Sequence, residues 1–267
     1  MFTWRSGDGT RYELIPPEYI VRSHEGLGMV PVELQTQRSP YQHGTTLIDS
    51  RLNERDFSLT IMIPGRTKQE KFEKRRELVT AFSPRLGMGR LIWRPGNLEK
   101  EFYIDAIADE APVMPTESGG PLHQEAIVNL MAPDPTFYEP EPEKIDHDTS
   151  AESRVKLQNA GDVETPVKIY VPGPCEDPTL LNRNTGEAIY IDGLEIGEDE
   201  TLEIDTAYGK KYARLRTDAG AVTNVLNRVE VGSQLFYLKP GTNRIDWRAK
   251  SGEPTIKYEY HNRYAGV

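Results

Sequence analysis

The sequence predicts a mainly β protein with one helix, divided into two β-sandwich domains, at about residues 1–140 and 141–267. Three observations predict this fold class. Apolar residues alternate in many short segments, one segment shows helical spacing, and a proline-rich acidic stretch interrupts both patterns near the midpoint. At 267 residues the chain is long enough for two domains that each bury a core.

The clearest strand of the amino-terminal half lies between residues 56 and 65. Its apolar residues occupy every second position, which places them on one face, and a Pro-Gly pair ends it: Phe57, Leu59, Ile61 and Ile63 are followed by Pro64 and Gly65. Further strands are expected at residues 90–94, 101–108 and 124–131. These strands form the sheet or sandwich of the first domain.

One helix is expected over residues 67–82. Thr67 is a suitable N-cap, and Glu70 follows at the spacing of a capping box. The predicted apolar side comprises Phe72, Val79 and Phe82, with Leu78 and Ala81 beside it. Pro84 ends the helix.

The carboxy-terminal half repeats the β pattern without a helix, and turn signals separate its segments. About eight short strands at this spacing are typical of an antiparallel sandwich or jelly roll. The expected strands are 155–157, 167–171, 188–191, 201–204, 212–215, 234–238, 243–247 and 255–260.

A segment of prolines and acids separates the two halves. Pro133, Pro135, Pro140 and Pro142 exclude a continuous helix or a central strand, so residues 133–149 are expected to form an extended connector. Composition alone is also consistent with a generic interdomain linker.

Charge and composition exclude several classes of function. The chain has 32 Lys and Arg against 42 Asp and Glu, with no concentrated basic surface, so nucleic-acid binding is not expected. No apolar run is long enough to span a bilayer and no secretion signal is visible, so synthesis in the cytoplasm without membrane insertion is expected. Cys175, the single cysteine, is expected to be a spectator thiol.

Motifs for catalysis, metals and cofactors are missing from the sequence. The five histidines are scattered, no nucleophile elbow or phosphate loop is present, and we expect no catalytic residues, no metal and no cofactor. An acidic stretch lacks the spacing of a calcium loop and is interpreted as a solvated turn, with paired-carboxylate hydrolysis as a remote alternative: Asp192, Glu195, Glu198, Asp199 and Glu200.

Three aromatic residues near the carboxyl end allow a second functional interpretation. Trp247, Tyr258 and Tyr260 lie on expected strands, and the two tyrosines share a face. Sugar-binding sandwiches present such rings to pyranose faces, whereas small sandwiches also bury aromatic rings in their cores. Both interpretations remain open at this point, core packing being the commoner.

The junction between the halves points to a known family. A strand ends at Met131 and is followed by Ala132, Pro133, Asp134 and Pro135, then by Phe137 and Tyr138. This junction, the strand and helix before it, and the turns around Asn159, Asn184 and Pro240 occur in an order that resembles the distal tail protein (Dit) family of siphophages, which have long non-contractile tails.

The resemblance implies a structural virion component and not an enzyme. It implies an amino-terminal domain that forms a hexameric ring and a galectin-like carboxy-terminal sandwich. The ring would join the tail tube protein to the baseplate hub or tail-associated protein at the distal end of the tail, with a receptor-binding protein as a further partner. The alternative is a carbohydrate-binding sandwich for host-surface recognition, at Trp247, Tyr258 and Tyr260.

Overall fold

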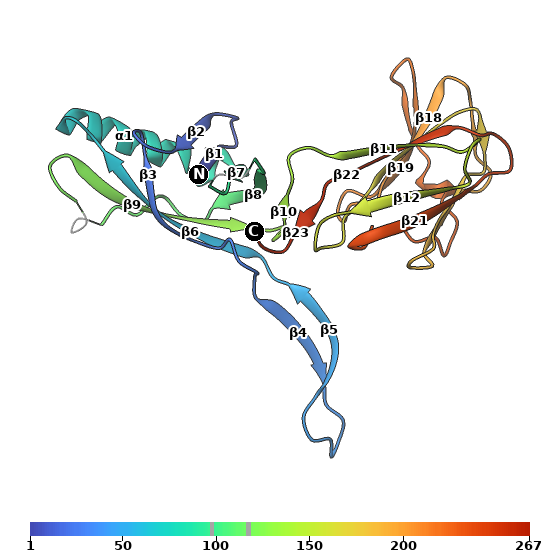
Figure 1. Ribbon diagram of the computed structural model, residues 1–267, viewed down its shortest axis with the longest axis horizontal. Helices are drawn as coiled ribbons and strands as arrows, with labels where there is room; N and C mark the ends of the chain where they lie inside the picture. Colours follow the sequence, from blue (N-terminus) through green and yellow to red (C-terminus); the bar gives the residue numbers. More distant parts are fainter. Residues whose placement is uncertain (97–98, 116–118) are drawn as a thin grey trace. The chain divides into compact units, whose positions relative to one another are not determined.

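The computed structural model describes residues 1–96, 99–115 and 119–267. The protein is mainly β with one α-helix, as predicted (Figure 1). Its chain forms two compact units: unit 1 comprises Met1–Pro140 and Tyr264–Val267, and unit 2 comprises Glu141–Arg263. The last four residues therefore return to unit 1, whereas the second domain had been expected to continue to residue 267.

Unit 1 is built on a nine-stranded antiparallel sheet whose main order is β2-β1-β7-β8-β9-β6-β3. β10 pairs with β8 and with β23. The strands are β1 (Phe2–Arg5), β2 (Arg11–Leu14), β3 (Ile20–Glu25), β6 (Arg55–Pro64), β7 (Gly89–Trp93), β8 (Phe102–Ala108), β9 (His123–Ala132), β10 (Phe137–Tyr138) and β23 (Arg263–Tyr264). The predicted strands at 56–65, 90–94, 101–108 and 124–131 are confirmed.

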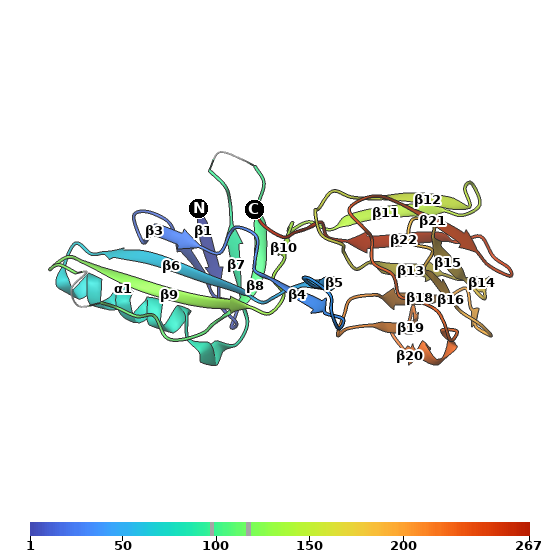
Figure 2. The ribbon, with the colours of Figure 1, turned by 90° about the horizontal axis from the view of Figure 1, so that it is seen from below.

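The sequence predicted a two-layered β-sandwich for the first domain. In the structure, the two layers of unit 1 are two parts of this one sheet. β8 pairs with β7 from Phe102 to Ala106 and with β9 at Ile107 and Ala108, so the sheet turns at β8. Figure 2 shows β6 and β9 crossing the direction of β7 and β8. One core cluster joins both parts of the sheet, including Trp4 and Ile104 from one part and Ile61 from the other.

Helix α1 (Lys68–Ala81) forms where it was predicted, with Thr67 as N-cap. The Thr67 hydroxyl accepts from the Glu70 amide at 3.1 Å, and the Glu70 carboxylate accepts from the Arg66 amide at 2.8 Å. The predicted apolar side was right for Phe82 and its neighbours and wrong for Phe72 and Val79, which are 52% and 41% exposed. The buried side contains Leu78, Ala81 and Phe82. A short 3₁₀ helix, Pro84–Leu86, follows.

Unit 2 is an antiparallel sandwich. A six-stranded sheet has the order β11-β22-β13-β18-β19-β20, a four-stranded sheet has the order β12-β21-β15-β16, and β14 pairs with β17. The bounds are β11 (Glu143–Asp148), β12 (Arg154–Asn159), β13 (Lys168–Pro172), β14 (Cys175–Glu176), β15 (Thr179–Asn182), β16 (Ala188–Tyr190), β17 (Glu195–Ile196), β18 (Glu200–Asp205), β19 (Tyr212–Thr217), β20 (Val222–Asn224), β21 (Gly241–Arg248) and β22 (Thr255–Tyr260). A second 3₁₀ helix spans Leu226–Arg228.

One prediction for this half was wrong. Residues 234–238 form no strand, because only the ends of this segment pair: the Gln234 amide donates to Ala188 and Leu238 forms an isolated bridge with Thr165. The segment 133–149, expected to form an extended connector, contains two strands, β10 and β11. The prolines flank these strands instead of preventing them, which is compatible with their missing amide donors.

Two buried carboxylates make the stability of unit 2 depend on pH. Glu203 accepts from Arg214 at 2.6 Å and from Arg216 at 2.7 Å, and Asp246 accepts from Arg154 and Arg183. Burial raises the pKa of Glu203, but the hydrogen bonds from the two arginines outweigh it, so the pKa lies below its usual range. The hydrogen bond from Arg154 is the main cause that lowers the pKa of Asp246.

Because both pKa values are lowered on folding, the stabilisation is present above the unfolded-state values of about 4 and is lost as the pH falls through the folded-state values. We expect Glu203→Gln to lower the free energy of unfolding by about 1–3 kcal/mol at pH 7. The difference from the unsubstituted protein should shrink towards pH 3 in urea titrations. A difference that is constant over this range would contradict the role of the Glu203 charge.

Candidate assembly surface

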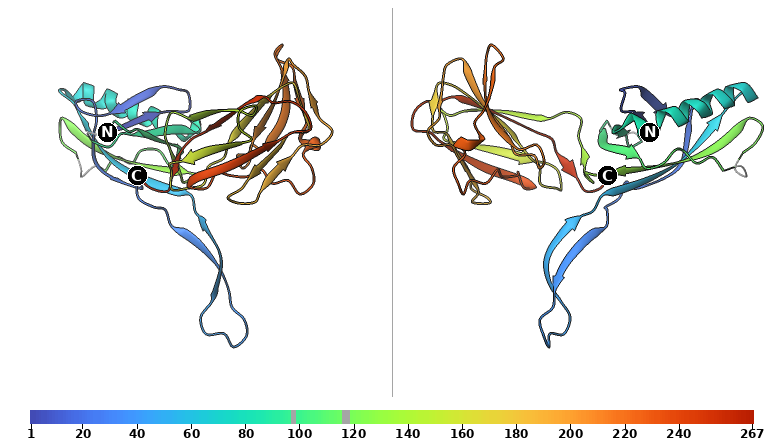
Figure 3. Two further views of the ribbon diagram at one scale, coloured as in Figure 1. Left: turned by 45° about the vertical axis from the view of Figure 1, so that its right-hand side comes forward. Right: turned by 180° about the vertical axis from the view of Figure 1, so that it is seen from behind.

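A hairpin of unit 1 stands apart from the large sheet. β4 (Val32–Gln37) and β5 (Thr46–Leu52) pair only with each other in the described chain, and together they form a separate two-stranded sheet. Figures 1 and 3 show the hairpin projecting from the end of β3 and β6. Almost all of its side chains are exposed or half-buried. Strands are normally supported by packing against a core, and a two-stranded hairpin without it is only marginally stable in water. This hairpin lacks such packing.

The register of the hairpin separates its side chains into an apolar and a polar face. Residues directly opposite in an antiparallel pair share a face. Val32 lies opposite Leu52, Leu34 opposite Ser50 and, beyond a register shift, Thr36 opposite Leu47. These six residues share one face, and four of them are apolar. The other face carries mainly polar and charged residues: Glu33, Gln35, Gln37, Thr46, Asp49 and Arg51.

The apolar face is uncovered. Leu34 and Leu47 are 59% and 58% exposed, and Ile48, at the register shift, is 60% exposed. Apolar side chains gathered on one face of a projecting element are typical of a surface that another protein covers. We name Val32, Leu34, Leu47, Ile48 and Leu52 the hairpin patch.

Five junction residues follow β9: Pro133, Asp134 and Pro135 lie between β9 and β10, and Phe137 and Tyr138 form β10. The Asp134 carboxylate accepts from the Thr136 amide at 3.1 Å, from the Thr136 hydroxyl at 2.6 Å and from the Tyr138 hydroxyl. Phe137 is fully buried in the core of unit 1. The junction is therefore a folded turn that belongs to unit 1.

Arg55 organises this part of unit 1, although the sequence interpretation assigned it no role. It is only 1% exposed and its guanidinium donates to four backbone carbonyls, of Pro135, Gly26, Gly28 and Ala265. The same group lies 4.7 Å from the centre of the Phe137 ring. Burial lowers the pKa of Arg55 to about 10, so the group remains charged at neutral pH.

A sequence signal for Arg55 does exist. Residue 55 has the same parity as Phe57, Leu59 and Ile61, so strand alternation places it on the core face of β6. A charged residue on such a face must find compensating hydrogen bonds. Backbone carbonyls supply them here, and no carboxylate does among the contacts described for Arg55.

The carboxyl end of the chain completes the Arg55 site. Ala265 supplies one of the four carbonyls, and the Val267 amide donates to Leu27 at 2.9 Å. The Tyr264 ring meets Phe102 edge-on at 5.3 Å, and its hydroxyl donates to Glu139 at 2.8 Å. The last residues are therefore a structural part of unit 1.

The three aromatic residues for which glycan contact was the alternative interpretation are buried. Trp247, Tyr258 and Tyr260 are 6%, 0% and 2% exposed and belong to the core of unit 2. They are on the inner faces of β21 and β22, where their rings fill the space between the sheets. The core interpretation is correct for all three, and none presents a ring to a ligand in solution.

The two tyrosines differ in a way that stability measurements can detect. The Tyr260 hydroxyl donates to Gln158 at 2.9 Å, whereas the Tyr258 hydroxyl is buried without a partner in the described structure. We expect Tyr258→Phe to keep or raise the free energy of unfolding, and Tyr260→Phe to lower it by about 1 kcal/mol. Thermal unfolding of the two variants side by side tests this. A larger loss for Tyr258→Phe would contradict the assignment.

The acidic stretch from Asp192 to Glu200 includes a turn between strands, and Cys175 is buried. The Glu200 carboxylate accepts from the Gly197 amide at 2.9 Å and closes the turn between β17 and β18. Among the described residues, no group of three or more His, Cys, Asp or Glu side chains is arranged to hold a metal ion.

Burial raises the pKa of the Cys175 thiol to about 11. No helix in the described ranges is long and apolar enough to cross a membrane.

Comparison with known proteins identifies both halves of the chain. Residues 160–264 match the siphovirus-type tail component, C-terminal domain (SPP1 Dit), and residues 16–117 match the phage tail protein RIFT-related domain. No curated protein matches the chain.

Solved structures share the fold over the whole length. The Dit protein of phage SPP1, described as a paradigm of the hub adsorption apparatus in phages that infect Gram-positive bacteria, superposes with a TM-score of 0.73 at 12% identity, covering 98% of this chain and 99% of that one. A chain of the phage p2 baseplate in its activated conformation with Ca gives 0.56 at 8% identity, with both chains covered completely. Its form with Sr gives 0.56 at 9%, again over the full length of both chains.

Three findings agree with one another: the order of elements, the family matches in both halves of the chain and the shared two-domain fold. A member of this family is a structural component of the phage tail and baseplate, hence of the virion, and not an enzyme. The chain belongs to the Dit family of siphophage tail proteins.

Proposed function

We propose that this protein forms a hexameric ring at the distal end of the tail, which joins the tail tube protein to the baseplate hub. The hairpin patch carries this proposal. Leu34 and Leu47 of the patch are each more than half exposed, and assembly would bury this apolar surface away from water. A second copy of the chain is the occupant we assign to it, since a ring presents every hairpin to an identical neighbour.

A head-to-tail contact suits this geometry. The hairpin and the surface that receives it are different parts of the chain, so the contact is heterologous, and such contacts close into a ring when their rotation fits. Unit 1 also has an outer strand, β3, which pairs with β6 on one side only within the described sheet. A strand with one free edge can accept another strand from a neighbour. These features support unit 1 as the ring-forming part.

The further partners follow from the position in the tail. A ring between tube and hub has one axial face for the tail tube protein and one for the hub or tail-associated protein, while unit 2 remains available for a receptor-binding protein. The family membership and the baseplate setting of the solved p2 chain support this arrangement.

Light scattering on the purified protein, followed by negative-stain imaging of the same sample, tests the ring. The expected result is a particle of about six times the 30.2 kDa chain mass with six-fold symmetry and a central opening. Mixing with purified tail tube protein should then give a stacked complex. A chain that remains monomeric at high concentration, both alone and with the tail tube protein, would contradict the proposal.

A further inference from the structure

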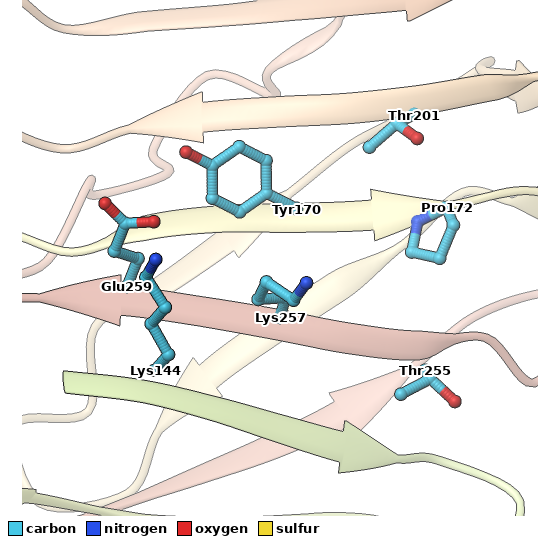
Figure 4. Close-up of a pocket in the computed structure, with 7 residues that line it drawn as sticks. All are labelled: Lys144, Tyr170, Pro172, Thr201, Thr255, Lys257 and Glu259. Carbon is cyan, nitrogen blue, oxygen red and sulfur yellow. The ribbon is translucent and has the colours of Figure 1, made fainter. Parts of the chain in front are cut away.

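A groove crosses the outer face of the six-stranded sheet in unit 2. Its volume is about 430 Å³, within the usual range of small-molecule sites. Figure 4 shows the lining side chains, which come from four adjacent strands: Lys144 of β11, Thr255, Lys257 and Glu259 of β22, Tyr170 and Pro172 of β13, and Thr201 of β18. All of them lie on the side of the sheet that faces away from the sandwich core.

Tyr170 lies in the middle of this groove. It alternates along β13 with the buried Ile169 and Val171, and it lies opposite Lys257 on one side and Glu203 on the other. Its ring is half-buried and drawn face-on in Figure 4. Burial, and next the nearby Glu259 carboxylate, raise the pKa of Tyr170, so the hydroxyl remains protonated. The groove therefore has a flat aromatic floor with a neutral hydroxyl at its edge.

The charged groups around the ring are free to meet a ligand. Lys144 lies directly opposite Glu259, and Lys257 directly opposite Asp146, yet neither lysine forms an ion pair in the part of the chain that the structure describes. The adjacent Glu203 differs, because Arg214 and Arg216 occupy both of its oxygens. Two ammonium groups and one carboxylate are thus the charged groups available in the groove.

The aromatic ring, the two ammonium groups and the carboxylate of the groove determine which class of ligand fits it. A saccharide has an apolar ring face that packs on an aromatic side chain, and hydroxyls that need both donors and acceptors. The lysines donate, Glu259 accepts, and Thr201 and Thr255 do either. A polyanion is disfavoured, because the Glu259 carboxylate lines the groove and Asp146 faces Lys257 across the strands.

We propose that this groove binds a neutral saccharide, with Tyr170 as the stacking platform, Lys144 and Lys257 as hydroxyl donors and Glu259 as acceptor. The site lies on the opposite face of β22 from the buried Tyr258 and Tyr260. It is independent of ring formation, because each copy of unit 2 contains all seven lining residues.

The test uses the full chain and neutral oligosaccharides of glucose, galactose, rhamnose and N-acetylglucosamine, with binding measured by saturation-transfer NMR and titration. At least one should bind with a dissociation constant of about 1 mM or lower. Tyr170→Ala should weaken binding at least about tenfold, and Tyr170→Phe, which keeps the ring, by no more than about threefold. The pair Lys144→Gln and Lys257→Gln should weaken it about fivefold or more.

Lys156→Gln is the matched control, because Lys156 is exposed on β12 in the other sheet of unit 2 and outside the groove lining. Its binding should equal that of the unsubstituted protein. The lysine variants are exposed and should fold normally, which keeps the test valid if Tyr170→Ala does not. Three results would overturn the proposal: no binding at millimolar sugar, binding unaffected by the Tyr170 and lysine variants, or binding only of phosphorylated or uronate-bearing sugars.

Discussion

Arg55→Met should lower the free energy of unfolding of unit 1 by about 4 kcal/mol, or its melting temperature by roughly 10 °C. The variant keeps most of the apolar stem and removes the guanidinium. Four carbonyls, of Pro135, Gly26, Gly28 and Ala265, would lose a donor at once. The contact with the Phe137 ring would also be lost. Differential scanning calorimetry measures the effect.

Two further variants separate the effect of the Arg55 charge from that of the guanidinium geometry. Arg55→Lys keeps the charge but has three donors on one nitrogen, which cannot reach four carbonyls, so a loss of about half the size is expected. Arg11→Met removes an arginine whose side chain is 62% exposed and should change stability by less than about 0.5 kcal/mol. Equal melting temperatures for Arg55→Met and Arg11→Met would contradict the central role of Arg55.

Removal of residues 264–267 tests the same site from its other side. The deletion removes the Ala265 carbonyl and the Tyr264 ring, so it should also destabilise unit 1. Because both changes act on one network, the combined loss should be smaller than the sum of the separate losses. Fully additive losses would show that the carboxyl end stabilises unit 1 without Arg55.

Leu34→Lys should weaken ring assembly at least about tenfold while leaving the melting temperature of the dissociated chain unchanged. Leu34 is central to the hairpin patch, and burying a lysine against an apolar partner surface leaves its charge without compensation. In the isolated chain the same residue is 59% exposed, so little is lost there. Sedimentation velocity over a concentration series measures the assembled fraction.

Gln35→Lys is the matched control on the polar face of the hairpin. It introduces the same charge one residue away, opposite Asp49, where the side chain remains in water. Assembly should be retained. If both variants assemble equally well, the apolar face is not the covered one; if both fail equally, the effect is one of net charge and not of the hairpin patch.

Strong local patterns predicted their elements correctly from the sequence. The alternation from Phe57 to Ile63 corresponds to β6, and Thr67 caps α1 at the expected position. Such signals are local, since side-chain parity and cap geometry depend on neighbours in the chain. The buried side of α1 was predicted correctly at Phe82 but not at Phe72, because Phe72 and Leu78 are both apolar and only packing on the sheet decides which is covered.

Features that depend on distant parts of the chain were missed. The hairpin of β4 and β5 has few apolar residues in alternation, and its strands are supported by no core, so residues 32–52 gave a weak β signal. The Arg55 site joins carbonyls from residue 26 to residue 265, a separation that no sequence window spans. The groove around Tyr170 likewise depends on the register of four strands.

The return of the carboxyl end to unit 1 has a consequence for biosynthesis. Unit 1 contains residues 1–140 but lacks Tyr264–Val267 until all of unit 2 has been translated. At about 5–20 residues per second, the intervening unit takes on the order of ten seconds to emerge. During that interval the guanidinium of Arg55 has three of its four carbonyls. Nascent chains cut short within unit 2 therefore contain an incomplete unit 1, so chains that include residues 264–267 have an advantage in stability before they assemble.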